Sequence, residues 1–254
     1  MDALSRRLQA ALGLLLLCAV LVPCMPAEPA AQASAKQVSA KQARAKQGEA
    51  EAKSAALPLY KPPLRGAPGG RVGGGTRGMP GRDIFVLAVL APDHTGLTTT
   101  EQPSLFWFIS AATSLPVELT ISDPNKVEPV LEARVPPAVE RGVHRLRLAD
   151  FGVRLAPGVT YQWSVTVVPD PARRSRDILA SGMIQRVEPS VELASRQAAA
   201  PDLDAVRLYA ENGLWYDALD AVSQLMESAP GDQMARRYRA ALLQQVGLGE
   251  LSEQ

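Results

Sequence analysis

The apolar residues between positions 83 and 187 restrict the fold more than any other feature, because they recur with the period of a β-strand. In the clearest segment, 117–122, Val, Leu and Ile alternate with Glu, Thr and Ser. The segments 84–91 and 105–109 are apolar on both faces, as central strands covered on both sides are. The predicted strands are 84–91, 105–109, 117–122, 127–134, 144–148, 161–167 and 179–187. Seven strands in about 105 residues predict an immunoglobulin-like or fibronectin type III-like β-sandwich.

One short segment supports this prediction. The residues from Leu155 to Tyr161, Leu-Ala-Pro-Gly-Val-Thr-Tyr, resemble the approach to the F strand of fibronectin type III domains. The resemblance implies a tyrosine corner, in which the hydroxyl group of Tyr161 bonds to the backbone a few residues upstream. Tyr161 is therefore expected to have a structural role.

After residue 190 the apolar residues follow the i, i+3, i+4 spacing of amphipathic helices. Gly213 and the Pro-Gly-Asp sequence at 230–232 separate three apolar stripes, and Gly247 ends the last one. The segment from Tyr209 to Pro230 resembles a tetratricopeptide repeat. Only about one and a half repeats fit, whereas an independent solenoid needs roughly three, so the helices are expected to pack on one another and on the sandwich. The predicted fold class is α+β, with a β-sandwich followed by a short C-terminal helical segment.

The first 33 residues have the pattern of a secretory signal peptide. Arg6 and Arg7 precede an apolar stretch, 10–22, which is too short to favour a membrane span. Cleavage is expected after Ala27 or Ala33. The mature chain is therefore expected in the periplasm or cell envelope, without a stable membrane span.

Cysteine occurs only at Cys18 and Cys24, both inside this signal. One alternative is an uncleaved anchor. Another is a lipoprotein anchored through Cys24, although Pro23 stands where a lipobox has Gly, Ala or Ser. After Ala33 no disulfide, zinc cluster, iron–sulfur site or thiol nucleophile is possible. Neither a metal nor a cofactor is expected.

The predicted organisation has five parts. They are a signal peptide (1–33), a low-complexity Ala/Lys/Gln linker (34–58), a Gly/Pro/Arg-rich loop (59–82), the β-sandwich (83–188) and the C-terminal helices (189–254). The formal net charge of +1 supplies no overall field that would attract nucleic acid.

The glycine-rich stretch before the first predicted strand is a candidate contact for an anion or a partner. Arg71, Gly74, Gly75 and Arg77 combine backbone N–H groups that can form an anion-binding nest with two guanidinium groups. The stretch has no Gly-Lys-Ser/Thr ending and precedes a strand, so it is not a P-loop or a dinucleotide fingerprint. The alternative is an ordered loop on a sheet edge that needs glycine for positive φ.

Trp215 and Tyr216 are candidates for a docking surface. Adjacent residues on a helix are not expected to face one core, so one of the two is expected to be exposed for a partner.

With these segments in order, the chain resembles the bacterial family known as domain of unknown function family 928. The glycine block and the Gly-Leu-Trp-Tyr-Asp-Ala-Leu string at 213–219 are the specific parts of the resemblance, whereas the strand segments alone are generic. The segments that carry it are 62–63, 66–68, 73–78, 87–92, 96–98, 101–108, 161–163 and 209–219. The resemblance implies an exported protein of bacteria that have an outer membrane, and it implies no activity.

The sequence favours a non-catalytic binding or scaffold protein whose partner is an envelope protein or a glycan. A Ser-His-Asp triad of Ser104, His94 and Asp93 lacks the Gly-x-Ser-x-Gly elbow that would support it. The carboxylates are scattered, and the sequence pairs no two of them across a cleft as a glycosidase requires. The alternatives are an enzyme that acts on envelope polysaccharide and an accessory subunit of a secretion or signalling assembly that docks through residues 201–247.

Overall fold

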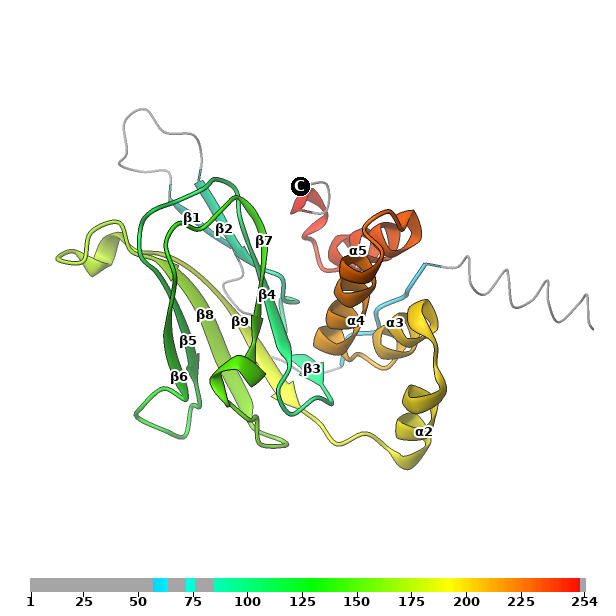
Figure 1. Cartoon of the computed structure of the whole chain (residues 1–254). Coiled ribbons are helices and arrows are strands. Elements are labelled where there is room, and N and C mark those ends of the chain that lie inside the picture. The colour runs from blue at the N-terminus through cyan, green and yellow to red at the C-terminus, as the bar shows by residue number, and fades with distance from the viewer. Residues whose placement is uncertain (1–56, 64–71, 76–84, 252–254) are drawn as a thin grey trace, which may run out of the picture. The chain divides into compact units, whose positions relative to one another are not determined.

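The computed structural model describes residues 57–63, 72–75 and 85–251. They form two β-sheets and a C-terminal group of helices (Figure 1). The strands, called the β region below, are β1 (Val72–Gly75), β2 (Phe85–Val89), β3 (Gly96–Thr98), β4 (Ser104–Ile109), β5 (Val117–Ser122), β6 (Leu131–Val135), β7 (Gly142–Arg147), β8 (Thr160–Val167) and β9 (Ile178–Arg186). The α+β class predicted from the sequence is confirmed.

The two sheets have the strand orders β1-β2-β4-β7 and β3-β9-β8-β5-β6. All neighbouring strands are antiparallel except β3 and β9, which are parallel. Strand β2 of the first sheet contacts β9 of the second, so the sheets pack on each other. Each of the seven predicted strands is present, and β1 and β3 are additional.

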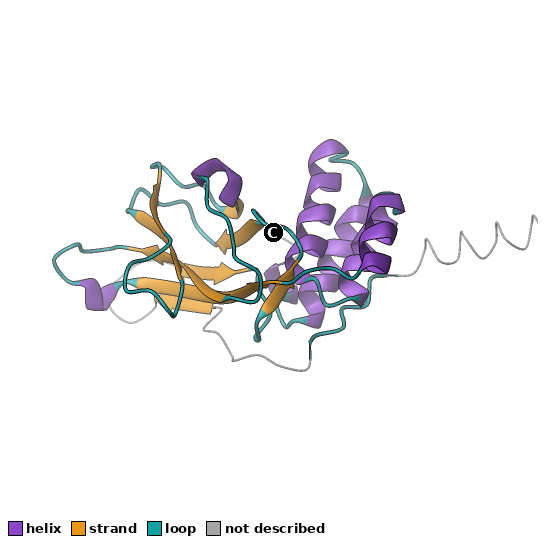
Figure 2. Cartoon of the chain, turned by 90° about the horizontal axis from the view of Figure 1, so that it is seen from below, coloured by secondary structure: helices purple, strands orange, loops and turns teal. Residues whose placement is uncertain are grey.

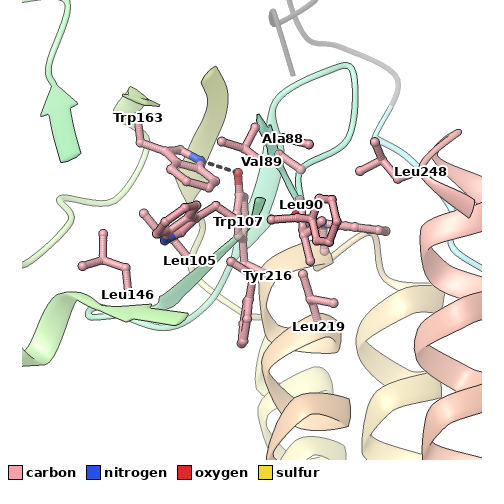
Figure 3. Close-up of a cluster of buried hydrophobic side chains, with 14 of the residues drawn as sticks. Ala88, Val89, Leu90, Leu105, Trp107, Leu146, Trp163, Tyr216, Leu219 and Leu248 are labelled. Atoms are coloured by element: carbon pink, nitrogen blue, oxygen red, sulfur yellow. Dashed lines mark hydrogen bonds between the residues drawn. The ribbon is translucent and has the colours of Figure 1, made fainter. Parts of the chain in front are cut away.

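The core between the sheets contains Trp107 of β4 and Trp163 of β8, which Figure 3 shows in one cluster with Leu105 and Leu146. All six residues of β4 are buried, as the prediction of a strand covered on both faces requires. Strand β5 instead alternates buried and half-buried residues, in agreement with its alternating sequence.

The helices, called the helical region below, are α2 (Val191–Ala199), α3 (Asp202–Glu211), α4 (Trp215–Ser228) and α5 (Gln233–Gln245). The hydroxyl group of Ser190 caps α2, and the Asp232 carboxylate caps α5 by accepting two backbone N–H groups. Gly213 ends α3 at φ +72°, a conformation that glycine adopts without strain. Short 3₁₀ helices lie at Leu148–Phe151, Arg174–Arg176 and Gly249–Leu251.

The helical region packs on the β region through α4, which contacts β3 and β4. Figure 2 shows the helices gathered beside the strands. Within the part of the chain that the structure describes, no helix has the length and hydropathy needed to cross a bilayer.

The hydroxyl group of Tyr161 makes the predicted contact with upstream backbone. It accepts a hydrogen bond from the N–H of Ala156 at 3.1 Å, and the Tyr161 side chain is buried. The predicted structural role of this tyrosine is confirmed.

Candidate functional site

The first turn of α4 and the end of β3 meet around a buried carboxylate, that of Asp217. Its Oδ1 accepts hydrogen bonds from the hydroxyl groups of Thr98 at 2.5 Å and Thr100 at 3.1 Å. Its Oδ2 accepts from the backbone N–H of Thr99 at 2.7 Å and from the Thr99 hydroxyl at 2.8 Å. Three consecutive threonines therefore surround one carboxylate that lies more than 100 positions away in the sequence.

The environment of this carboxylate acts on its pKa in two opposite ways. Burial raises the pKa of Asp217, and the hydrogen bonds from the three threonines oppose that rise. The Thr98 hydroxyl also accepts the backbone N–H of Thr100 at 3.0 Å, which directs its own proton to Asp217. Because its two oxygens accept four hydrogen bonds from residues 98–100, the Asp217 carboxylate joins the start of α4 to the end of β3.

Tyr216, the neighbour of Asp217, fastens the same turn to the core. Its hydroxyl group accepts the indole N–H of Trp163 at 2.9 Å and donates to the carbonyl oxygen of Met183 at 3.0 Å (Figure 3). A Cβ atom added to Gly96 would lie 2.7 Å from the Tyr216 ring, so this ring packs directly on the backbone of β3. Burial raises the pKa of Tyr216 well above its usual range.

Trp215 is anchored to a different part of the β region. Its indole N–H donates to the carbonyl oxygen of Leu90 at 2.9 Å, just after β2. Trp215 and Tyr216 both have an exposed fraction of 0%. The prediction that one of them is exposed for a partner is wrong, because both side chains belong to the core that the strands and the helices share. The expected docking surface is an internal joint.

The segments of the sequence that meet at this joint are those that carry the family resemblance. The profile of the family described as Domain of Unknown Function (DUF928) matches residues 72–254. The chain belongs to this family. A search of the curated proteins gave no match. Within the DUF928 region, the Gly-Leu-Thr segment at 96–98 and the Trp-Tyr-Asp segment at 215–217 come together at the joint.

A segment that precedes the DUF928 match, 57–63, lies across the helical region. The backbone N–H of Tyr60 donates to the side chain of Gln245 at 2.8 Å, and that of Lys61 donates to the carbonyl oxygen of Ala210 at 3.0 Å. The Tyr60 ring meets Trp215 edge to face at a centroid distance of 5.1 Å. This segment therefore covers Trp215.

Tyr60 also ends a chain of hydrogen bonds that resembles a proton relay. His94 lies with Nδ1 3.0 Å from Oδ1 of Asp93 and Nε2 2.9 Å from the hydroxyl oxygen of Tyr60. In the neutral tautomer with the proton on Nδ1, Asp93 accepts that proton and Nε2 accepts the proton of the Tyr60 hydroxyl. Burial and the nearby Asp93 charge raise the pKa of Tyr60 well above its usual range, so the hydroxyl keeps its proton. The chain thus fixes the position of Tyr60.

Ser104 is not part of this chain. It is buried in β4, where its hydroxyl oxygen accepts from Nε of Arg145 at 3.0 Å. A Ser-His-Asp triad of Ser104, His94 and Asp93 is thus not formed. His144, the other histidine, stacks on Trp107 at a centroid distance of 4.4 Å and bonds to the Glu140 carbonyl oxygen at 2.7 Å.

Arg145 links β7 to α4 through the two terminal nitrogens of its guanidinium group. Nη1 donates to both carboxylate oxygens of Glu227 at 3.1 Å, and Nη2 donates to Asp220 at 2.6 Å. Its Cζ atom lies 5.6 Å from the centre of the Phe106 ring, a cation–π distance. Ion pairs on the outer face of the sheet thus hold the middle and the end of α4, whereas Asp217 holds its beginning.

A cavity of about 250 Å³ lies next to this network, between β4 and β7 on one side and α4 and α5 on the other. It is lined by Phe106, Val143, His144, Arg145, Ser223, Met226, Glu227 and Arg239. Among the described residues, no group of three or more His, Cys, Asp or Glu side chains could hold a metal ion.

The glycine-rich candidate site is described only in part. Gly74 and Gly75 belong to β1, where Gly74 pairs with Val86 and Gly75 with Phe85. Part of the expected loop is therefore a strand. Arg71 and Arg77 lie outside the described residues, so contact of this block with an anion, a glycan or a partner remains a prediction.

The sequence reasoning missed Asp217 as a site residue. Two signals were available, namely an acidic residue in the first turn of a helix and three threonines in succession after a short apolar segment. The sequence does not show that the acidic residue contacts the threonines, because this contact depends on how α4 lies on β3.

Proposed function

We propose that the protein is an exported, non-catalytic binding or scaffold protein of the bacterial envelope. One observation carries this proposal: Trp215, Tyr216 and Asp217, in the most specific motif of the chain, all serve to hold α4 on the β region. A motif used in this way defines shape, whereas a catalytic motif leaves polar groups free to meet a substrate.

The strand order supports an immunoglobulin-like or fibronectin type III-like sandwich as the body of this protein. Strands β2, β4 and β7 follow one another in one sheet as strands A, B and E do in such folds. Strands β9, β8, β5 and β6 follow one another in the other sheet as G, F, C and C′ do. Tyr161 lies at the start of β8, the position of the tyrosine corner on strand F. Sandwiches of this kind commonly present loops and sheet edges to partners.

The helical region supports a tetratricopeptide-like arrangement. Helices α3 and α4 pack on each other across a turn at 212–214, and α4 packs in turn on α5. Ala210 and Ala218 are completely buried, as the small residues that let two helices approach closely are. Because α4 is also fixed to the β region, the helices and the strands share one hydrophobic core.

The location in the envelope is supported by the N-terminal sequence. Arg6, Arg7 and the apolar stretch 10–22 have the order of a signal peptide, and the chain that follows has no cysteine after Cys24. Expression with a tag at the C-terminus, followed by fractionation of cells, tests this part. Recovery of the uncleaved chain from the cytoplasm would contradict it.

A second candidate function is an enzyme that acts on envelope polysaccharide. The observation in its favour is that Asp220 and Glu227 both contact Arg145 and thus lie near each other beside the cavity. Two acids near a cleft are what a glycosidase needs. Both carboxylates already form ion pairs with the same guanidinium group, which favours the scaffold role for them.

One experiment separates the two functions. Purified mature protein is incubated with isolated cell-wall polysaccharide, and binding is measured by co-sedimentation while soluble reducing sugar is measured in the supernatant. We expect no sugar release from the wild type or from the Asp220→Asn, Glu227→Gln double variant. Release by the wild type that the double variant loses would establish the enzyme and end the scaffold proposal.

Capture of a protein partner uses the full chain as bait. A chain that ends at Glu188 is not a suitable comparison, because it lacks Tyr216 and Trp215 and so exposes Trp163 and the carbonyl oxygen of Leu90. Surface variants that leave the joint intact are suitable. Failure of the full chain to bind any envelope protein or glycan in a saturable way would contradict the binding role.

A further inference from the structure

We propose that the cavity between β4, β7, α4 and α5 binds a small organic carboxylate, with the guanidinium group of Arg239 as its anchor. This inference names a ligand class for the binding role proposed above and rests on it. The cavity volume, about 250 Å³, fits a ligand of roughly the size of an amino acid or a short-chain acid.

Arg239 differs from the other arginine in the cavity wall. Arg145 is neutralised by Asp220 and Glu227 and has only 15% of its side chain exposed. Arg239 is half-buried, yet no ion pair joins its guanidinium group to a carboxylate of the described residues. Burial and the neighbouring charge of Arg236 lower the pKa of Arg239, in agreement with a cation that lacks a counter-ion.

Positive charge is in excess beside the cavity. Arg145 pairs with Asp220 and shares Glu227 with Arg147, whereas no ion pair joins Arg239 or its neighbour Arg236 to a carboxylate of the described residues. A half-buried cation without a partner is unfavourable, and an anion that enters the cavity relieves the cost. This excess of positive charge favours an anionic ligand.

The shape of the wall selects a carboxylate with an apolar body. Phe106, Val143 and Met226 supply apolar surface, and Arg239 supplies a planar fork of donors that suits the two oxygens of a carboxylate. A phosphate dianion fits less well, because its second charge would lie near Glu227. An amide of the same shape has no charge to offer Arg239.

The test measures binding of hexanoate, acetate, phenylacetate, hexanamide and inorganic phosphate to the full mature chain by calorimetry and by thermal shift. We expect saturable binding of hexanoate or phenylacetate, weaker binding of acetate and phosphate, and none of hexanamide. Arg239→Gln should weaken hexanoate binding by at least about tenfold, because a charge-assisted pair is lost. The matched control is Arg237→Gln, which removes an exposed arginine from the same helix and should leave binding unchanged.

Met226→Glu provides a second route to the same answer, because it places a negative charge in the apolar wall without altering Arg239. It should also weaken hexanoate binding, and circular dichroism shows whether either variant is folded. Absence of binding of all three carboxylates to the wild type would overturn the inference, as would equal binding by Arg239→Gln or tighter binding of phosphate than of hexanoate. The sugar-release and partner-capture measurements are independent of these results, so a failure here is distinguishable from failure of the scaffold proposal.

Discussion

Replacement of Asp217 by alanine is the sharpest test of the joint between the β region and the helical region. The change removes the acceptor of four hydrogen bonds and leaves their donors in place. Thr98 is 0% exposed and Thr99 is half-buried, so the Thr98 hydroxyl and the Thr99 N–H gain little from water, whereas the hydroxyls of Thr99 and Thr100 can turn toward water. Each unsatisfied buried donor costs about 1–3 kcal/mol, so these two donors give a loss of about 2–6 kcal/mol for Asp217→Ala.

Urea denaturation and thermal unfolding of the mature chain measure this loss. For a domain of this size each kcal/mol lowers Tm by about 2–4 °C, so the expected fall is about 4–24 °C. The matched control is Asp204→Ala. Asp204 lies in the first turn of α3, pairs with Arg207 on the surface and is 50% exposed, so its replacement should cost less than about 1 kcal/mol.

Asp217→Asn separates the charge of the carboxylate from its role as an acceptor. The asparagine oxygen still accepts the Thr99 N–H, but its NH₂ group faces the Thr98 and Thr100 hydroxyls, which must turn to accept. We expect a loss of about 1–2 kcal/mol, between the wild type and the alanine variant. If Asp217→Ala unfolds at the same urea concentration as the control, the carboxylate does not hold α4 and the reasoning fails.

Three other changes test separate parts of the structure. Tyr161→Phe removes the hydroxyl acceptor at the start of β8 and should cost about 1 kcal/mol, seen as a fall in Tm of about 2–4 °C. Gly96→Ala places a methyl group 2.7 Å from the fixed Tyr216 ring and should cost about 1–3 kcal/mol by urea denaturation. Glu118→Gln should cost less than about 1 kcal/mol at pH 7, since its partners Arg134 and Arg174 are largely exposed, and the cost should vanish in acid and in high salt.

Each of these changes has a control or an opposing outcome. Gly231→Ala adds its methyl group where no atom lies within 4 Å and should be neutral, so equal losses at Gly231 and Gly96 would contradict the packing argument. An unchanged Tm for Tyr161→Phe would contradict a stabilising role for the hydrogen bond between Tyr161 and Ala156.

The hydrogen bond from Arg174 lowers the pKa of Glu118. The folded state therefore binds this proton less readily, and the contribution of Glu118 is present above its unfolded pKa and lost as pH falls through the folded one. If Glu118→Gln destabilised the protein more at acidic pH than at pH 7, this reasoning would be wrong.

The strands were predictable because their apolar pattern is local. Segment 117–122 alternates residue by residue, and β5 buries every second residue as that pattern requires. Tyr161 was predictable for the same reason, since the bond to Ala156 spans only five residues. Strand β1 was not predictable from Val72–Gly75, because glycine has low strand propensity and this segment becomes a strand by pairing with β2.

The joint was not predictable because it depends on contacts between distant segments. Strand β3 has only three residues, too few to show a period, and it lies where β9 and α4 hold it. The error over Trp215 and Tyr216 has the same origin. Adjacent helical side chains point in different directions, and the rule that one must be exposed holds only for a helix with a free face. Around the first turn of α4 the structure leaves no such face, because segment 57–63 covers Trp215.

Helix α4 connects the two proposals. Its first turn is fixed by Asp217 and Tyr216, and its last turns carry Met226 and Glu227 into the cavity wall. Asp217 and Met226 are nine positions apart, which corresponds to roughly 14 Å along the helix, so a group bound at the cavity does not touch the joint. The joint nevertheless determines where that wall lies, because a helix moves as a rigid rod. The residues that form the joint and the residues that line the cavity are therefore different sets, and the first set positions the second.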